Sequence, residues 1–310
     1  MNGLIRDSIL NQSKQKSQYN DKKVSIMLIS RFAPSPTGLL HLGHAYSAFL
    51  TQNLVENNSG SLLLRIEDID KTRCTSDFEK QIYRDLKWLG IHWNDTPIRQ
   101  SDRLSCYSYY LKKLAKKGLA YGCDCTRSDI KRALSAPNRP RKNSNTPVYP
   151  GTCREKNLSL DNQNIRLNIV KSIAYLKKNT LNFYEQGTGP NGESGAQVVS
   201  LDLLAKNYGD FIIARRDINT SYHLSVTVDD AYQKITHVSR GNDLFYITPM
   251  HILLQKLLDF NTPKYMHHPL ITDGHGHKLS KSKGSESILN LRESGKDLET
   301  IRSMLGCNSN

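Results

Sequence analysis

Short apolar runs and longer amphipathic segments alternate along the first part of the chain. The runs at 24–29 and 61–66 are apolar and of strand length, which predicts buried strands. Apolar residues recur every three or four positions at 41–57, 78–89 and 105–117, which is typical of helices with one buried face. This alternation predicts an α/β fold with a parallel sheet and right-handed crossovers.

The pattern changes after residue 121. Positions 123–156 are polar and hold three of the six cysteines, and the next stretch contains one strand-like run at 165–170. Alternation then resumes, with three strand-like runs and a helical segment at 211–215, 224–228, 235–239 and 249–260. We therefore expect a Rossmann-type nucleotide-binding domain that is split by an insertion.

These changes of pattern divide the chain into four expected regions. The catalytic domain would comprise 24–121 and 201–284, with the insertion at 122–200 between its halves. Residues 1–23 are rich in Lys, Gln, Asn and Ser and lack the apolar core of a secretory signal, so we expect a disordered extension. The remaining residues, 285–310, would form a short C-terminal tail.

Composition adds a compartment and a class of partner. The 310 residues carry a formal net charge of +14, which favours a polyanionic partner but also fits a solvated basic surface. Six cysteines are too few for a disulfide framework, so we expect a reducing, cytoplasmic location. No apolar run approaches the roughly 20 residues that span a bilayer, which excludes a membrane protein with spanning helices.

The segment after the first predicted strand carries the strongest chemical signal. Two prolines and a glycine impose a loop there, and His41-Leu-Gly43-His44 follows at the start of the predicted helix. Ligands of open α/β sheets bind at the carboxyl ends of strands, so this helix start suits a nucleotide and its phosphates. Gly43 would let a base or phosphate approach the backbone. The two histidines could instead simply cap the helix, and a metal site would lack a third ligand nearby.

A second basic motif lies near the end of the chain. Lys278-Leu-Ser280-Lys281-Ser282 has glycines on either side, and its two lysines could contact a triphosphate. A solvated basic loop is the alternative when this motif is considered alone.

Together the two motifs resemble the HIGH and KMSKS motifs of class I aminoacyl-tRNA synthetases. The segment Arg31-Phe-Ala-Pro-Ser-Pro-Thr-Gly38 is similar to the glutamyl branch of that class. So are Arg65-Ile-Glu-Asp68, Val228-Asp-Asp-Ala231 and the segment at 237–244. The resemblance covers most of the chain, from about residue 30 to residue 284.

Within that branch the chain resembles the glutamyl-queuosine tRNA(Asp) synthetases, a family of short paralogues of glutamyl-tRNA synthetase. Only 28 residues follow Ser282, too few to build the anticodon-binding domain of the full-length enzymes, so we expect none. The segments at 123–130 and 148–154 are also similar to the short family.

The resemblance implies activation of L-glutamate by ATP and Mg²⁺ as glutamyl-adenylate, without tRNA. The glutamyl group would then pass to the cyclopentenediol of queuosine in the anticodon of tRNA(Asp).

The resemblance also implies which residues bind the substrates. Those implied for ATP are His41, Gly43, His44, Lys278, Ser280 and Lys281. Of these, His41, His44 and Lys281 would be catalytic, with Lys281 clamping the pyrophosphate. The residues implied for glutamate are Arg31, Ala33, Ser35, Glu67, Tyr222 and Arg240. A guanidinium fork suits the carboxylate of glutamate. Glu67 and Asp68 could instead be solvated charges at a strand end.

Three cysteines form a candidate metal site. Cys123 and Cys125 are one residue closer together than in the usual zinc knuckle, and with Cys153 they leave a tetrahedral Zn²⁺ one ligand short. Three plain thiols are the alternative. The family resemblance supplies Tyr149 as the fourth ligand of a structural zinc site.

Two other functions fit the motifs, namely a truncated glutamyl-tRNA synthetase that charges a tRNA 3′ end and a catalytically silent tRNA-binding paralogue. Intact His41, His44 and Lys281 argue against the silent paralogue. His223 stands where the resemblance leads us to expect Gln, beside the glutamate pocket. We expect a monomer whose partners are ATP, L-glutamate and queuosine-containing tRNA(Asp), with no membrane.

Overall fold

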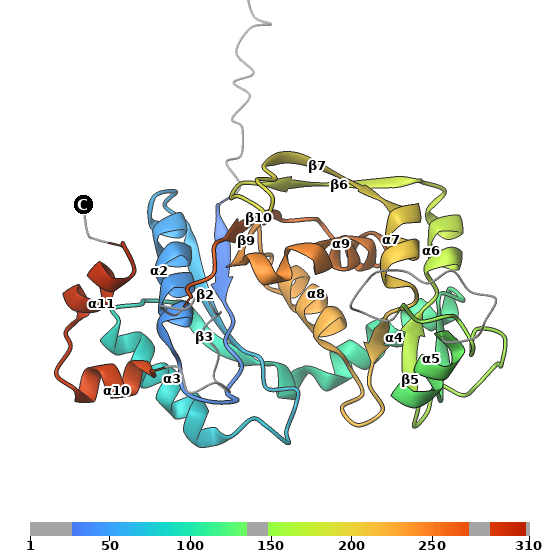
Figure 1. Cartoon of the computed structure of the whole chain (residues 1–310), viewed down its shortest axis with the longest axis horizontal. Helices are drawn as coiled ribbons and strands as arrows, with labels where there is room; N and C mark the ends of the chain where they lie inside the picture. Colours follow the sequence, from blue (N-terminus) through green and yellow to red (C-terminus); the bar gives the residue numbers. More distant parts are fainter. Residues whose placement is uncertain (1–26, 135–147, 273–285, 308–310) are drawn as a thin grey trace, which may run out of the picture.

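The computed structural model describes residues 27–134, 148–272 and 286–307 (Figure 1). The extension expected at 1–23 lies outside these ranges, and so do Lys278, Ser280 and Lys281 of the second basic motif. Among the described residues, no helix is long and apolar enough to cross a membrane.

A parallel sheet forms the centre of the fold, in two halves that meet between β1 and β9 (Figure 1). Its strands, in spatial order, are β3 (Asn94–Arg99), β2 (Ser61–Ile66), β1 (Ile29–Phe32), β9 (His237–Gly241) and β10 (Lys264–His268). The backbone N–H of Thr236 donates to the carbonyl of Ile29 at 2.9 Å and joins the halves. This is the strand order of a Rossmann fold, so the expected fold class is confirmed.

Helices cover both faces of this sheet. Leu62 and Leu64 of β2 pack into one core, and Leu63, which points to the opposite face, packs into another. The helices of the first core are α2 (Leu42–Glu56), α3 (Ser76–Trp88), α10 (Ile288–Glu293) and α11 (Leu298–Met304). The second core includes α4 (Leu104–Lys116), α8 (Tyr222–Tyr232) and α9 (Thr248–Leu257), and it continues into helices that lie between α4 and α8 in the sequence. Burial on both faces explains why Leu62, Leu63 and Leu64 are apolar without alternation.

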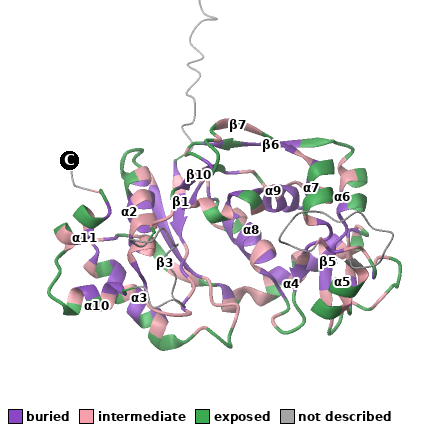
Figure 2. Ribbon diagram, in the orientation of Figure 1, coloured by how far each residue is buried: buried purple, intermediate pink, exposed green. Residues whose placement is uncertain are grey.

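The helices predicted at 41–57, 78–89, 105–117 and 249–260 correspond to α2, α3, α4 and α9 to within three residues at each end. Short 3₁₀ turns, η1 (Gln100–Arg103) and η2 (Asn242–Ile247), precede α4 and α9. Figure 2 shows the buried residues gathered along the central strands and on α8 and α9.

The helix α8 lies where the sequence predicted a strand, at 224–228. The Ser221 hydroxyl accepts from the backbone N–H of Leu224 and caps the helix. Every residue from 224 to 230 is buried, because α4 and α9 both pack against α8. A helix that is buried all round shows no helical period, so its β-branched residues read as a strand.

A smaller antiparallel sheet is built from β4 (Ala120–Cys123), β5 (Asn164–Leu167) and β8 (Ile212–Ala214). The same part of the chain contributes α5 (Arg127–Leu134), α6 (Ile169–Leu176) and α7 (Leu201–Tyr208), on the side of α9 away from α2 in Figure 1. A hairpin of β6 (Thr180–Glu185) and β7 (Gly195–Ser200) also lies in this part.

Two strand pairings cross the boundaries expected for the insertion at 122–200. β6, inside that range, pairs with β10 and extends the central sheet. β8, outside it, pairs with β5 in the smaller sheet. The expected boundaries followed changes in local composition, and pairing between distant strands leaves no mark in local composition.

Candidate active site

Those residues expected to bind ATP and glutamate that the structure describes meet in a cleft of about 550 Å³ at the carboxyl ends of β1 and β9. This is the point where the strand order of the sheet reverses, the usual ligand site of such folds. The expected residues that line the cleft are Arg31, Ala33, Ser35, His41, Gly43, His44, Glu67, Tyr222 and Arg240. The sequence therefore identified residues that the fold brings together from β1, α2, α8 and β9.

His41 and His44 cap α2 and also line the cleft. The Nδ1 atom of His41 accepts from the backbone N–H of Gly43 at 3.1 Å, and Nδ1 of His44 accepts from the N–H of His41 at 3.2 Å. The two histidines therefore cap the helix, as the alternative interpretation predicted, and also line the cleft. Because Nδ1 accepts, a neutral ring carries its proton on Nε2, a donor suited to phosphate oxygens.

Gly43 leaves room for this reciprocal cap. A Cβ atom at position 43 would lie 3.0 Å from Cε1 of the His41 ring, closer than side chains normally pack. The glycine of the motif therefore leaves space for the His41 ring as well as for any ligand that approaches the backbone.

A buried ion-pair network orients Arg31. The Asp230 carboxylate on α8 accepts from Nε of Arg31 at 2.9 Å and from Nη2 of Arg65 at 2.8 Å. Burial opposes the charge of Asp230, but Arg31 and Arg65 outweigh it and hold the pKa of that carboxyl below its ordinary value. The same contacts leave part of the Arg31 guanidinium to line the cleft.

Glu67 is a largely buried acidic group of the cleft with a raised pKa. Its side chain is 10% exposed, and Nε of Arg65 lies 3.6 Å from its Oε1. Burial raises the pKa of Glu67 to about 7, although Arg65 and Arg31 act in the opposite direction. A carboxyl group with this pKa is partly ionised near neutral pH. In its carboxylate form it can bind a substrate cation.

Arg240 is held by three acceptors that sequence reasoning missed. Its Nε donates to Nε2 of His267 at 3.1 Å, its Nη1 to Nδ1 of His251 at 3.1 Å, and its Nη2 to the Thr248 hydroxyl. These residues come from α9 and β10, and no local spacing in the sequence connects them with β9. Beyond them, Nδ1 of His223 lies 3.1 Å from Nε2 of His251.

Tyr222 completes the inner wall of the cleft at the first turn of α8. Burial raises the pKa of its phenol above the ordinary value, so the group is a neutral donor at physiological pH. With Arg31, Arg240 and Glu67 it gives the cleft donors for two carboxylates and an acceptor for an ammonium group.

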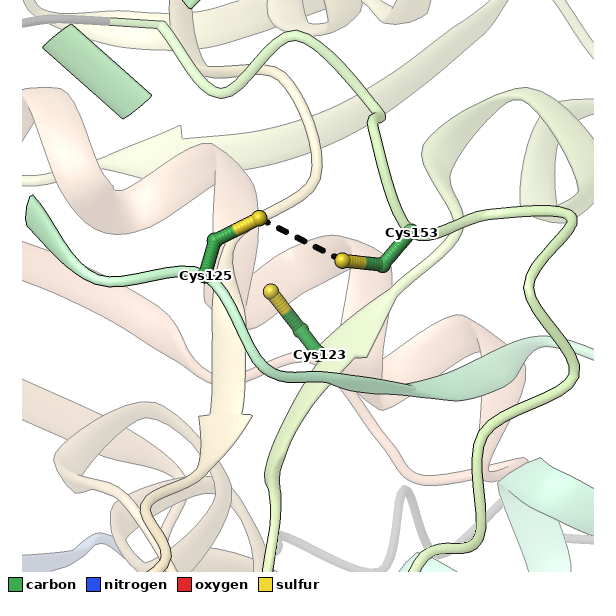
Figure 3. Close-up of side chains that lie close together, drawn as sticks. All are labelled: Cys123, Cys125 and Cys153. Carbon is green, nitrogen blue, oxygen red and sulfur yellow. Dashed lines mark hydrogen bonds between the residues drawn. The ribbon is translucent and has the colours of Figure 1, made fainter. Parts of the chain in front are cut away.

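The cysteine cluster lies apart from the cleft, where β4 ends. Figure 3 shows the thiols of Cys123, Cys125 and Cys153 pointing toward one another, and their sulfur atoms all lie within 4.8 Å of one another. The Tyr149 hydroxyl is 3.4 Å from the Cys123 sulfur and 3.6 Å from the Cys125 sulfur. Four ligands of a tetrahedral Zn²⁺ would be about 3.5 to 3.8 Å apart, so the donor set fits such an ion.

A guanidinium lies against this cluster. Nε of Arg166 is 3.2 Å from the Cys123 sulfur, and the guanidinium carbon is 3.7 Å above the centre of the Tyr149 ring. Burial acts against ionisation of Cys123, but its hydrogen bonds with Tyr149 and Arg166 lower the pKa of this thiol overall. Cys123 and Cys153 are fully buried, which suits a structural ion rather than a reactive one.

Comparison with known proteins places these features in a family. Residues 27–306 match the family described as tRNA synthetases class I (E and Q), catalytic domain. A glutamyl-Q tRNA(Asp) synthetase of Rhodobacter capsulatus is 42% identical over 280 residues, which are 90% of this chain and 100% of the relative.

Longer proteins also match. A glutamate–tRNA ligase of a Hydrogenobaculum species is 38% identical over 87% of this chain, which spans 55% of that ligase. The crystal structure of a glutamate tRNA ligase from Elizabethkingia meningosepticum, in complex with its amino acid, superposes with a TM-score of 0.67 at 25% identity. That superposition covers 90% of this chain and 60% of the ligase.

Proposed function

Because the chain belongs to the class I tRNA synthetases of the E and Q catalytic-domain family, we propose that it activates L-glutamate with ATP and transfers it to queuosine in tRNA(Asp). The chain is a ligase of the aminoacyl-tRNA synthetase type. The adenylate intermediate, activation without RNA and the queuosine acceptor are proposals. The observation that carries them is one cleft that combines two arginines, Glu67 and the paired histidines of α2.

The cleft suggests how glutamate would be held. Arg31 and Arg240 would bind its side-chain carboxylate, since a planar guanidinium offers two parallel donors to two oxygens. The Tyr222 hydroxyl would add a third donor. Glu67 and Ser35 would receive the ammonium group, with the backbone at Ala33 closing the pocket beside β1.

Activation would need no protein nucleophile. An oxygen of the glutamate α-carboxylate attacks the α-phosphorus of ATP, the bond to the bridging oxygen breaks, and pyrophosphate leaves with the electron pair. His41 and His44 would donate to the phosphate oxygens and stabilise the charge that develops there. Lys278, Ser280 and Lys281, which lie outside the described residues, are proposed to bind the phosphates from the second motif. Class I synthetases use ATP with Mg²⁺, which would neutralise phosphate charge.

The second step would move the glutamyl group to RNA. A hydroxyl oxygen of the queuosine cyclopentenediol attacks the carbonyl carbon of the adenylate and loses its proton to solvent. The bond from that carbon to the phosphate oxygen breaks, and AMP leaves with the electron pair. The net charge of +14 supports a polyanionic partner for this step. The full-length match to a relative named for glutamyl-Q tRNA(Asp) supports the specific acceptor.

We also propose that Cys123, Cys125, Tyr149 and Cys153 bind one structural Zn²⁺. The ion would fix the loop around Cys153 to the end of β4, because these ligands lie far apart in the sequence.

Pyrophosphate exchange tests the activation step. We expect glutamate-dependent exchange of labelled pyrophosphate into ATP in the absence of RNA, and no exchange with glutamine or aspartate. Failure of the wild-type protein to exchange with glutamate would overturn the activation proposal and would favour the silent tRNA-binding paralogue.

A transfer assay then identifies the acceptor. Labelled glutamate should enter tRNA(Asp) that carries queuosine and an isolated anticodon stem-loop that carries it, but not tRNA(Asp) without the modification. The identity to glutamate–tRNA ligases favours one second candidate, charging of the 3′ end. Transfer to unmodified tRNA that disappears when the 3′-terminal adenosine is removed would establish that candidate instead.

A further inference from the structure

The hydrogen bonds of Arg240 leave a defined pair of donors. Three of its five N–H groups are taken by His267, His251 and Thr248. Among the described residues, these contacts leave one N–H on each of the two terminal nitrogens of Arg240. A carboxylate can make a two-point contact either with Nε and one terminal nitrogen or with both terminal nitrogens. Because Nε of Arg240 already donates to His267, only the pair of terminal nitrogens is left for a substrate.

The donor-only character of arginine fixes the tautomers of its neighbours. Nδ1 of His251 must accept from Arg240, so in the neutral ring the proton is on Nε2, which donates to Nδ1 of His223. In the same way, Nε2 of His267 accepts from Arg240, and its Nδ1 donates to the Glu185 carboxylate at 2.6 Å. Two lines of hydrogen bonds therefore start at Arg240, and each ends at an acceptor on another element.

The line through His251 depends on neutral imidazoles. Burial, reinforced by the charge of Arg240, lowers the pKa of His223 to about 4 and lowers that of His251 well below its ordinary value. His251 is 2% exposed, so water cannot replace it as an acceptor for Arg240. Among the described residues, the charged and titratable groups around His251 are Arg240, Arg31, His267 with Glu185, and Tyr222. His223 also lines a second cavity, which it shares with Asp70, Arg73, Arg166 and Arg215.

We propose that His251 and His223 are positioning residues that orient Arg240 for the carboxylate of glutamate and so set the affinity for this substrate. The inference rests on the proposed function, since it takes Arg240 to bind glutamate. His251 would act directly on Arg240. His223 would act through His251, by accepting a hydrogen bond from its Nε2–H and so holding the ring in one tautomer.

Substitutions that keep or remove the hydrogen bonds separate this role from packing. In His251→Gln, a side-chain oxygen can accept from Arg240 and a side-chain N–H can donate to His223, whereas His251→Leu can do neither. We expect His251→Leu to raise the KM for glutamate about tenfold or more in pyrophosphate exchange, with little change in the KM for ATP. We expect His251→Gln to stay within about threefold of the wild type.

His223 should show the same preference with a smaller effect. His223→Leu is expected to raise the KM for glutamate about threefold, and His223→Gln to leave it near the wild-type value. In the double variant with both leucines, the KM should not exceed that of His251→Leu alone, because His223 acts through His251. His237→Leu is the matched control, since His237 lies on the same strand as Arg240 but lines a separate cavity with no residue in common with the cleft.

Each outcome distinguishes this inference from the proposed function. A wild-type protein without glutamate-dependent exchange overturns both. If the wild type is active and His251→Leu keeps a wild-type KM for glutamate, or His251→Gln loses as much affinity as His251→Leu, the positioning role is wrong and the proposed function stands. Thermal unfolding of all variants reports any loss of folded protein, and KM values are compared at temperatures where each variant remains folded.

Discussion

Glu67 is the residue through which pH acts most directly on the proposed amino-acid pocket. Burial places its pKa at about 7, against the opposing charges of Arg65 and Arg31. Only the carboxylate attracts the substrate ammonium, so we expect the KM for glutamate to fall as the pH rises from about 6 to about 8. Below the pKa the change should approach tenfold per pH unit.

Pyrophosphate exchange at saturating ATP measures this dependence. Glu67→Gln should raise the KM for glutamate and flatten its pH profile, whereas the exposed control Glu56→Gln should keep the wild-type profile. A wild-type KM that is constant over the same pH range would contradict the role of Glu67.

Buried histidines at the same site make folding sensitive to acid. The pKa of His223 is about 4 in the folded protein, because of burial and the charge of Arg240, and an ordinary histidine titrates near 6.5. The unfolded chain therefore binds a proton that the folded chain does not, and stability is full above about pH 6.5 and falls as the pH approaches 4. The free energy of unfolding of the wild type should therefore decrease in acid, and we expect His223→Gln to make this decrease smaller by up to about 3 kcal/mol.

Urea unfolding near pH 7 and near pH 4.5 gives the two free energies for each variant. The exposed residue His92 supplies the control, because His92→Gln should lose as much stability in acid as the wild type. An equal acid-dependent loss in His223→Gln and the wild type would show that His223 titrates normally in the folded protein.

At the residue scale, the motifs indicated which side chains line the cleft but not what holds them. Arg31, Glu67 and Arg240 belong to recognisable segments, and all three line the cleft. The acceptors of Arg240 belong to no motif, because α9 and β10 reach β9 only after the sheet has formed. Sequence spacing describes neighbours along one element, whereas these contacts are made between elements.

At the scale of elements, the helix after the second motif is anchored to the first motif. Ser287 and His41 form an antiparallel bridge, and the backbone N–H of Ile288 donates to the carbonyl of Leu40 at 2.8 Å. Leu291 of α10 is 1% exposed in the core that includes α2 and α3. The chain on the C-terminal side of the lysine motif is thus fixed beside the start of α2.

Truncation of this anchor tests whether α10 folds with the sheet. We expect Leu291→Ala to lower the free energy of unfolding by about 2–4 kcal/mol, because it opens a cavity in a shared core. The control Met304→Ala, at a half-exposed position of α11, should change it by less than about 1 kcal/mol. Chemical denaturation measures both values, and an unchanged midpoint for Leu291→Ala would mean that α10 unfolds separately.

The helices α2, α3, α4 and α9 were placed to within three residues, whereas α8 was predicted as a strand because its buried segment contains the β-branched residues Val226, Thr227 and Val228. The shorter helices α6 and α7 were not predicted. Of the strand predicted at 24–29, positions 24–26 lie outside the described residues. The observed β1 continues to Phe32, because its buried residues include Arg31, a charged residue that an apolar pattern excludes. A buried ion pair with Asp230 makes that position possible.

At the scale of the whole molecule, the cysteine cluster and the cleft are built by different sheets. The Asp210 carboxylate, which is fully buried, accepts from Arg154 next to Cys153 and from the hydroxyl of Tyr121 on β4. The Cys153 loop is therefore tied to the smaller sheet, whereas the residues that line the cleft come from the central sheet and its helices. None of the three cysteines lines the cleft.

This division predicts that loss of metal acts on the smaller sheet before it acts on amino-acid activation. We expect about one Zn²⁺ per chain, and a lower midpoint of thermal unfolding after chelation or in Cys153→Ser. Cys106→Ser, which removes a thiol of α4 outside the cluster, should keep both the zinc and the midpoint.

At a temperature where the chelated protein stays folded, glutamate-dependent pyrophosphate exchange should persist, because no proposed ligand of Zn²⁺ contributes to the cleft. Transfer to RNA should fall more steeply than exchange if the smaller sheet helps to hold the acceptor. Loss of exchange in step with loss of zinc would contradict this division, and a protein that binds no zinc at any loading would remove the metal site itself.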